Sequence, residues 1–249
     1  MKKLLEVCVD SMASARAAIA GGADRLELCS AICVGGLTPY GGLLQQIRRE
    51  SEIEIRCMIR PRPGDFLYSR DEVELMCMQV RELKVLKPDG FVFGALTSLG
   101  DLDDDTMQRL MDEAGDCRVT LHRAIDVSRD PETTYMRAAE MGVDTVLTSG
   151  GAKNCLLGRE TIGRLLDHQA QIHGPKVLIG AGVHAGVITE LRSRLLGAEQ
   201  FHLSGKREME SGMIFRRSDV PMGLIGMDEW HYQQTDTEKV RAAREALDK

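Results

Sequence analysis

Residues 4–28, LLEVCVDSMASARAAIAGGADRLEL, contain the unit that decides the fold. A β-rich run at Leu4–Val9 precedes an amphipathic stretch that opens with Ser11, a residue type that caps helix N-termini. The phrase Gly21-Gly22-Ala23-Asp24 separates this stretch from a second run at Arg25–Leu28. Because glycine past a helix end adopts the left-handed conformation without a Cβ clash, this order predicts a strand, a helix and a second strand.

The same alternation continues to the end of the chain. Six further β-rich runs are Glu54–Ile59, Gly90–Phe93, Arg118–His122, Thr145–Thr148, Lys176–Gly180 and Gln200–Leu203. The further amphipathic stretches are Gly42–Ser51, Arg70–Leu86, Asp103–Ala114, Pro131–Met141, Glu160–His173 and Ala185–Leu195, with a C-terminal helix at about 236–247. Eight such units in about 250 residues match one TIM barrel, and eight near-even units favour it over a doubly wound open sheet. No Pro/Ser-rich linker divides the chain, so residues 1–249 are predicted to form a single α/β domain, a (β/α)8 TIM barrel.

Composition and charge exclude several classes of protein. The chain has 249 residues, a hydrophobic share of 43% and a formal net charge of −6. Basic residues form no stripe and aromatic residues make up 4%, so we expect no nucleic-acid partner. No apolar run approaches the roughly 20 residues that span a bilayer, and no secretory signal is visible, so we expect no membrane association. Seven cysteines without a C-x-x-C spacing then predict reduced thiols in a cytoplasmic protein.

The predicted barrel interior carries an unusual number of charged and polar side chains. Side chains alternate between the interior and the helix layer along each strand, and apolar Leu5, Val7 and Val9 suit the helix layer. The residues that this alternation turns inward include Glu6, Cys8, Asp10, Arg25, Glu27, Cys29, Arg56, Met58, Arg60, Arg118, Thr120, His122, His202 and Ser204. Packed barrels are normally filled with Val, Ile and Leu. Isolated buried charges cost several kcal/mol each, so these side chains must pair or line a wet cavity.

Two interpretations of this interior remain open. The lower layers are consistent with a structural ion-pair network in which Arg25, Arg56 and Arg118 pair with Glu6 and Glu27. The carboxyl ends of the strands are where barrel active sites form, and there we favour a functional role. The candidate catalytic residues are Glu6, Glu27, Arg60, His122 and Asp126. A histidine followed four residues later by an aspartate could form a general base with an orienting carboxylate, although a strand-end histidine is often a hydrogen-bonded core residue. No reaction is assignable.

Glycine-rich loops and a proline-stiffened loop predict an anion site at the same end. Strands six, seven and eight are followed by residues 147–151, 179–183 and 202–205, whose backbone N–H groups could cradle a phosphate or another anion. Rigid guanidinium groups in the phrase Arg60-Pro61-Arg62-Pro63 suit carboxylates and phosphates. The candidate anion-binding residues are Arg60, Arg62, Ser149, Gly150, Gly151, Gly182 and Ser204. The alternatives are that the glycines only permit tight turns and that Arg62 pairs with Asp65.

Two cysteines are candidate metal ligands. Alternation places Cys8 and Cys29 inward at equivalent heights on neighbouring strands, which lie about 4.8 Å apart. Two thiolates could hold one Cu(I) ion, because Cu(I) favours low-coordinate thiolate or thioether sites, and Met58 and Cys33 could add soft ligands. The alternative is that both cysteines pack as small hydrophobic residues.

Ordered phrases along nearly the whole chain resemble the CutC copper-homeostasis family. They are Glu6-Val7-Cys8-Val9-Asp10-Ser11, Gly22-Ala23-Asp24-Arg25-Leu26-Glu27-Leu28-Cys29, Gly35-Gly36-Leu37-Thr38-Pro39, Ile59-Arg60-Pro61-Arg62, Gly64-Asp65-Phe66, His122-Arg123-Ala124, Leu147-Thr148-Ser149-Gly150, Gly180-Ala181-Gly182-Val183 and Ser211-Gly212-Met213-Ile214-Phe215-Arg216. The chain departs from the family at Tyr40, where a small serine is usual, and at Pro63, where glycine is frequent. The resemblance implies a cytoplasmic TIM-barrel homodimer linked to copper tolerance or trafficking, with Cys8 and Cys29 as Cu(I) ligands.

Two hypotheses of function therefore stand. One is a cytosolic copper homeostasis protein that binds Cu(I) through Cys8 and Cys29. The other is a TIM-barrel enzyme that acts on a small phosphorylated or carboxylated metabolite. A separate expectation concerns the irregular segment at about 205–230, which carries Met209, Met213, Phe215, Met222, Met227 and Trp230. A long loop with this many apolar side chains is expected to fold over the barrel or to form a dimer contact.

Overall fold

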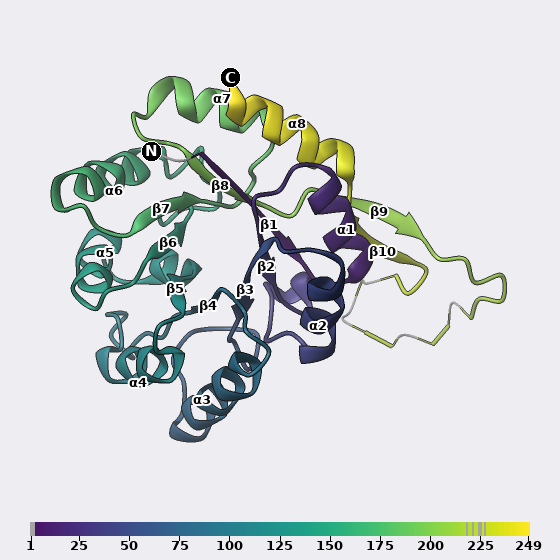
Figure 1. The fold of residues 1–249 in the computed structure, drawn as a ribbon, viewed down its shortest axis with the longest axis horizontal. Helices are drawn as coiled ribbons and strands as arrows, with labels where there is room; N and C mark the ends of the chain where they lie inside the picture. Colours follow the sequence, from purple (N-terminus) through teal and green to yellow (C-terminus); the bar gives the residue numbers. More distant parts are fainter. Residues whose placement is uncertain (1–2, 218, 221, 224–225, 227) are drawn as a thin grey trace.

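Eight parallel strands close into a barrel in the order of the sequence (Figure 1). The structure is a computed structural model that describes residues 3–217, 219–220, 222–223, 226 and 228–249. The barrel strands are β1 Leu4–Val9, β2 Arg25–Leu28, β3 Glu54–Met58, β4 Gly90–Phe93, β5 Arg118–Leu121, β6 Thr145–Thr148, β7 Lys176–Ile179 and β8 Gln200–Leu203. Strand β1 pairs with both β2 and β8, which completes the closure. The predicted TIM barrel is confirmed.

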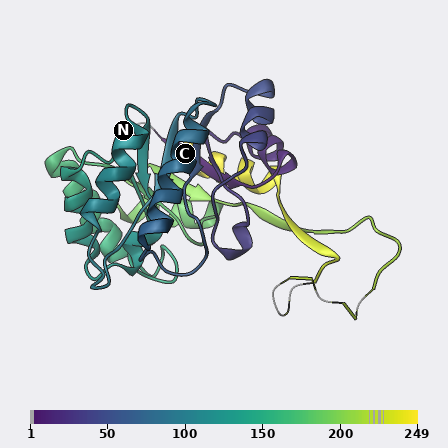
Figure 2. The ribbon, with the colours of Figure 1, turned by 90° about the horizontal axis from the view of Figure 1, so that it is seen from below.

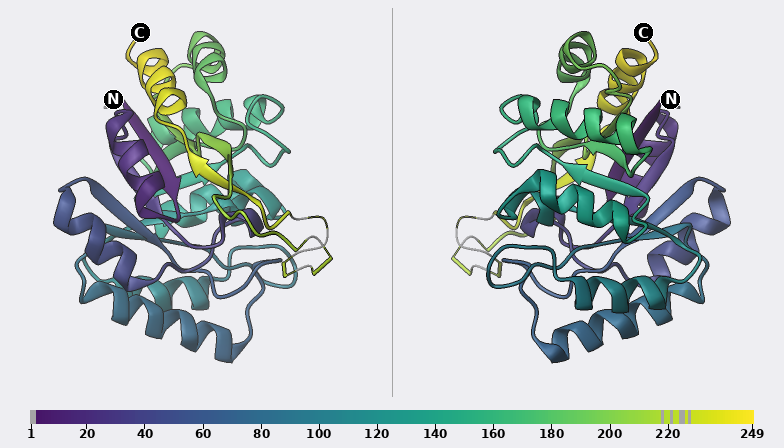
Figure 3. Two further views of the ribbon diagram at one scale, coloured as in Figure 1. Left: turned by 90° about the vertical axis from the view of Figure 1, so that its right-hand side faces the viewer. Right: turned by 90° about the vertical axis from the view of Figure 1, so that its left-hand side faces the viewer.

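The helices form a layer around the outside of the barrel (Figures 1 and 3). They are α1 Met12–Ala20, α2 Gly41–Glu50, α3 Arg70–Lys84, α4 Asp104–Ala114, α5 Pro131–Glu140, α6 Arg159–Ile172, α7 Ala185–Arg194 and α8 Thr237–Asp248, with 3-10 turns η1 Ile32–Val34 and η2 Arg123–Val127. The side chain of Ser11 accepts a hydrogen bond from the Ser14 N–H and so caps the helix. Helix α1 therefore begins at Met12, one residue after the Ser11 with which the predicted stretch opens. Ser69 and Glu72 form a reciprocal capping box at the start of α3. No helix in the described part of the chain is long and apolar enough to cross a bilayer.

The main hydrophobic core lies between the strands and the helices, as the alternation predicts. Leu5, Val7 and Val9 of β1 are fully buried in this layer together with residues of every helix. The opposite face of the same strand turns Glu6 and Cys8 into the barrel, where both are also buried. The barrel therefore has an apolar outer layer, whose burial favours folding, and an interior that holds charged and polar side chains.

The lower interior is filled by an ion-pair network. Arg25 Nε lies 2.5 Å from Glu6 Oε2, and both side chains are almost completely buried. Arg56 lies 3.2 Å from Glu54 and 2.7 Å from Asp144, whose carboxylates sit near the rim. Two residues differ from the expected network: Arg118 is exposed because it begins its strand at the rim, and Glu27 faces the cavity described below.

The segment at about 205–230, which the sequence predicts to be irregular, belongs to an antiparallel two-stranded arm. Strand β9 Lys206–Glu210 pairs with β10 His231–Thr235, and the Thr235 N–H donates to Ser14 Oγ at 3.1 Å, which ties the base of the arm to α1. The described residues of the arm extend away from the barrel and do not cover it (Figure 2). Large apolar side chains on it are exposed, namely Met213, Ile214, Phe215 and Met222. Met227 lies outside the described residues.

Candidate functional site

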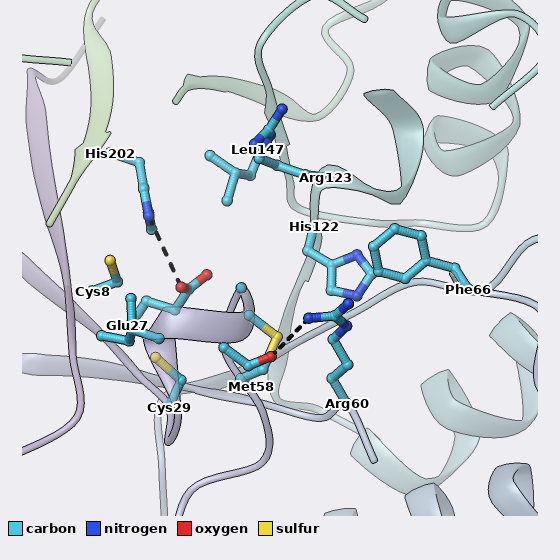
Figure 4. Close-up of a pocket in the computed structure, with 13 residues that line it drawn as sticks. Cys8, Glu27, Cys29, Met58, Arg60, Phe66, His122, Arg123, Leu147 and His202 are labelled. Carbon is cyan, nitrogen blue, oxygen red and sulfur yellow. Dashed lines mark hydrogen bonds and ion pairs between the residues drawn. The ribbon is translucent and has the colours of Figure 1, made fainter. Parts of the chain in front are cut away.

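A cavity of about 230 Å³ opens at the carboxyl ends of the strands (Figure 4). Strands β1, β2, β3 and β8 and the loops after β3 and β5 supply its polar lining. The lining residues are Cys8, Glu27, Cys29, Ile32, Gly35, Gly36, Met58, Arg60, Phe66, His122, Arg123, Leu147 and His202. The cavity therefore brings together five residues that the sequence selects as candidates: Cys8, Glu27, Cys29, Arg60 and His122.

Three donor groups of the cavity form a compact cluster. Ligand atoms of Cys8, Glu27 and His202 all lie within 4.8 Å of one another. The register of the sheet explains this, because Cys8 pairs with Glu27 across β1 and β2, and Glu6 pairs with His202 across β1 and β8. Figure 4 shows the Glu27 carboxylate pointing toward His202, with Cys8 beside it. Sequence alternation turns His202 inward but gives no reason to select it, since its role depends on barrel closure.

Glu6 orients His202. Its Oε1 atom lies 2.7 Å from His202 Nδ1, so the other ring nitrogen, Nε2, faces the cavity and lies 4.0 Å from Glu27 Oε2. Burial by itself would raise the pKa of Glu6, but Arg25 and the hydrogen bond to His202 lower it to about 2. Burial likewise opposes protonation of His202, yet Glu27, Cys8 and Glu6 raise its pKa well above the ordinary value. Glu6 therefore holds a histidine in place; it is not itself in the cavity lining.

Glu27 behaves differently from Glu6. Burial raises the pKa of Glu27 to about 7, against the opposing effect of the His202 charge. Within the described part of the chain, its buried Oε1 atom has no hydrogen-bond partner. A carboxyl group of this kind can exchange a proton near neutral pH, which is the property required of a general acid or base.

Cys29 lies nearer the carboxyl ends of the strands than Cys8 does, whereas alternation predicts that the two cysteines lie at the same height in the barrel. The residue opposite Cys8 is Glu27, and the Cys29 N–H donates to Val9 O farther along the barrel. The Cys29 thiol lies 3.7 Å from the same carbonyl, and burial, followed by Cys8 and Glu27, raises its pKa well above the ordinary value. Cys8, Cys29 and Met58 nevertheless belong to one buried cluster, so the three sulfur-bearing side chains pack in the same part of the barrel. Cys33 is exposed and is not part of the lining.

Arg60 and His122 lie on the other side of the cavity, against the ring of Phe66 (Figure 4). The Arg60 guanidinium lies 5.1 Å from the centre of that ring, and the His122 ring centre lies 4.7 Å from it. Arg60 donates to the carbonyl oxygens of Val34, Gly36 and Gly64. Burial, and then the charge of Arg60, lower the pKa of His122 to about 3, so the ring is neutral.

Asp126 does not orient His122. Its carboxylate accepts hydrogen bonds from Thr148 Oγ1 at 2.6 Å, from the Ser149 N–H at 2.9 Å and from the Gly151 N–H at 3.0 Å. The Gly150 N–H donates to Thr148 Oγ1 at 2.8 Å. The sequence predicts that the N–H groups of the glycine-rich loop after β6 bind an external anion, but in the structure they bind the carboxylate of Asp126. His122 Nδ1 instead accepts a hydrogen bond from the Ala124 N–H at 3.3 Å.

The remaining candidates for anion binding are Arg62, which lies in the loop after β3, and Gly182 and Ser204, which lie after β7 and β8. Arg62 pairs with Glu72 at 2.5 Å and with Asp65 at 3.0 Å, and stacks over the Tyr68 ring, so it stabilises its own loop. Gly182 and Ser204 line a second cavity of about 250 Å³ that shares Cys8 and His202 with the first. Of the seven residues proposed for anion binding, Arg60 alone lines the main cavity.

Comparisons with known proteins agree with the fold and identify the family. The sequence model of the CutC family matches residues 3–207. The human copper homeostasis protein cutC homolog is 42% identical over 242 residues, which cover 96% of this chain and 86% of the human protein. A CutC family protein of Chromobacterium violaceum is 41% identical over 250 residues and covers both chains fully. A crystal structure of CutC from Streptococcus agalactiae superposes with a TM-score of 0.76 at 24% identity, over 81% of this chain and 98% of that one. The chain belongs to the CutC family.

Proposed function

We propose that this protein acts in copper homeostasis by binding Cu(I) in the barrel cavity, with Cys8 as the central ligand. The observation that carries the proposal is that Cys8 belongs to two groups of potential metal ligands, one of sulfur-bearing side chains and one with oxygen and nitrogen atoms. Cys29 and Met58 pack beside it as soft sulfur donors, while Glu27 and His202 bring oxygen and nitrogen atoms to within 4.8 Å. Cu(I) selects soft thiolate and thioether ligands, so Cys8 with Cys29 forms its core site, and His202 Nε2 becomes a further donor when the ring releases its proton.

The cellular setting and the assembly are part of the same proposal. Seven cysteines are free thiols in the structure, which suits the reducing cytoplasm. We place the protein there as a homodimer whose contact includes the arm, because the apolar residues on the arm are exposed in one chain. A second copy would remove them from water.

The test is an anaerobic titration with Cu(I) against a competing chelator, run in parallel with Zn(II). Cys8→Ser should weaken binding of both ions by more than about tenfold, since outer-shell changes alone cost that much. Cys29→Ser should weaken Cu(I) selectively, and Glu27→Gln should weaken Zn(II) selectively, because Zn(II) accepts oxygen ligands that Cu(I) does not favour. Cys77→Ser, buried on α3 in the helix layer, is the matched control. Tight Cu(I) binding that persists in Cys8→Ser would contradict the proposal.

A second candidate function is an enzyme that acts on a small phosphorylated or carboxylated metabolite. Glu27, Arg60 and His122 line the same cavity, and each keeps a buried polar atom without a hydrogen-bond partner. A copper site at Cys8 does not use Arg60 or His122, so these two residues favour a second ligand. Binding of anions to metal-free protein tests this candidate.

A further inference from the structure

Three buried side chains in the cavity have unmet hydrogen-bonding capacity. Glu27, Arg60 and His122 are 3%, 6% and 3% exposed, and the atoms without partners are Glu27 Oε1, Arg60 Nε and His122 Nε2. Nearly all buried polar groups in proteins are hydrogen-bonded, because an unmet donor or acceptor costs about 1–3 kcal/mol. Three such groups around one cavity indicate a missing polar ligand.

His122 presents a hydrogen-bond donor. Its Nδ1 atom accepts the Ala124 N–H at 3.3 Å, so the neutral ring carries its proton on Nε2. The Phe66 ring packs against the imidazole with centres 4.7 Å apart and fixes its orientation. The free N–H is therefore held ready for an acceptor.

Arg60 presents a positive charge without a countercharge. The other inward arginines have carboxylates, since Arg25 pairs with Glu6 and Arg56 pairs with Asp144. Among the described residues, Arg60 donates to three carbonyl oxygens and is in hydrogen-bond contact with the Tyr68 hydroxyl, and none of these groups carries a net charge. A buried cation in this state favours an anion that supplies the missing charge.

We propose that the cavity binds a small hydroxy- or amino-carboxylate, whose carboxylate lies at Arg60 and His122 and whose hydroxyl or amino group donates to Glu27. The inference rests on the second candidate function, deepens it by naming the ligand class, and is independent of copper. The single positive charge of Arg60 matches the single negative charge of a carboxylate. Glu27 lies on the opposite side of the cavity (Figure 4) and accepts hydrogen bonds, so the other end of the ligand must carry a donor.

The loop geometry favours a carboxylate over a phosphate. Barrel phosphate sites use free backbone N–H groups in the loops after the last strands. Gly182 and Ser204, which follow β7 and β8, line the second cavity and not this one, and in the loop after β6 the N–H groups of Ser149 and Gly151 donate to Asp126. Ile32, Met58 and Leu147 complete the lining with apolar surface, which suits a short carbon skeleton more than a dianion.

The experiment measures binding to the full chain in the presence of a metal chelator, by calorimetry and by thermal shift. The probes are glycolate, lactate, glycine and alanine, together with glycolamide, lactamide and inorganic phosphate. The carboxylates should raise the melting temperature by binding only the folded state, whereas the neutral amides should not. Phosphate should bind more weakly than the carboxylate that binds best.

Variants and a direct spectroscopic signal locate the ligand. His122→Phe keeps an aromatic ring against Phe66 and should weaken carboxylate binding by about tenfold or more, the loss expected for a hydrogen bond to a charged group. Arg118→Gln removes an equal charge at the opposite rim of the barrel, where Arg118 is exposed, and should bind normally. In ¹⁵N-labelled unmodified protein the His122 Nε2–H resonance should shift on addition of the carboxylate, a readout that does not depend on folding of a variant.

The possible failures are distinguishable. Phosphate binding without carboxylate binding would overturn the proposed ligand class and leave the second candidate function standing. Equal affinity for amides and carboxylates would overturn the role of the Arg60 charge. No binding of any probe, with an unmoved His122 resonance, would overturn both the inference and the second candidate function, without bearing on the copper titration.

Discussion

Glu6 and Glu27 show how two buried carboxyl groups on adjacent strands take different roles. Both are inward residues of the first two strands, and both are at least 97% buried. Arg25 lies 2.5 Å from Glu6 and keeps it ionised, whereas Glu27 has no arginine partner and burial raises its pKa to about 7. The position of one guanidinium therefore separates an ionised structural carboxylate from a carboxyl group whose pKa lies near neutral pH.

Glu27 should make stability depend on pH. Its pKa rises from 4.5 to about 7 on folding, so its contribution is fully present below pH 4.5 and is lost as the pH rises toward 7. The loss is on the order of 3 kcal/mol. In urea unfolding measured across this range, Glu27→Gln should flatten the decline relative to the unmodified protein. The exposed Glu52→Gln is the control and should keep the decline; an unchanged slope in Glu27→Gln would refute the assignment.

At the scale of elements, the loop after β6 is organised by a residue from a neighbouring element. Asp126 lies in η2 and accepts hydrogen bonds from three groups of that loop, while Arg123 of the same turn lies 2.6 Å from the carboxylate. A Cβ on Gly150 would lie 2.2 Å from Gly158 O, so the loop also requires glycine there. The loop is therefore built as a rigid part of the barrel mouth.

Asp126→Ala should loosen this loop without disturbing the proposed metal site. The loss of the carboxylate leaves the Ser149 and Gly151 N–H groups without acceptors and should reduce the unfolding free energy by about 1–3 kcal/mol. Both amides should lose protection in hydrogen exchange, while Cu(I) affinity should be retained because the donor cluster lies on β1, β2 and β8. Asp130→Ala, which removes a helix cap of α5, is the control and should leave that protection intact. Unchanged exchange at both amides in Asp126→Ala would show that the carboxylate does not hold the loop.

At the scale of the whole molecule, a compact barrel carries one extended part. The arm of β9 and β10 is tied to α1 at its base and leaves the barrel surface beyond that point (Figures 1 and 2). Ile214 is fully exposed and Phe215 is 72% exposed. Apolar side chains in such a position are usually covered by a partner, and a second copy of the chain is the proposed one.

Ile214→Glu should weaken the proposed homodimer. A charge in an apolar contact costs several kcal/mol when buried, so the monomer fraction should rise at a fixed concentration in size-exclusion chromatography with light scattering. Leu196→Glu is the matched control, because Leu196 is 99% exposed on the connection between α7 and β8 and lies outside the arm. A monomeric unmodified protein would refute the dimer proposal.

The sequence by itself determines the layout of this protein. Repeated units predict the closed barrel, and a side-chain period of two places Glu6, Cys8 and Glu27 inward. Alternation states which face a residue occupies but not its height, because the hydrogen-bond register between strands decides that. For this reason alternation matches Cys29 to Cys8, although the register places Glu27 opposite Cys8, and it gives no ground for selecting His202.

Only the tertiary structure decided which polar groups become hydrogen-bond or ion-pair partners. Asp126 meets the loop after β6 across 22 to 25 residues of sequence, and Arg60 reaches carbonyl groups of the η1 loop. Both contacts depend on barrel closure, which brings together loops that no local pattern relates. Among the described residues, closure also leaves Arg60 without a carboxylate while Arg25 and Arg56 have theirs, and this difference separates the proposed binding cavity from the ion-pair network.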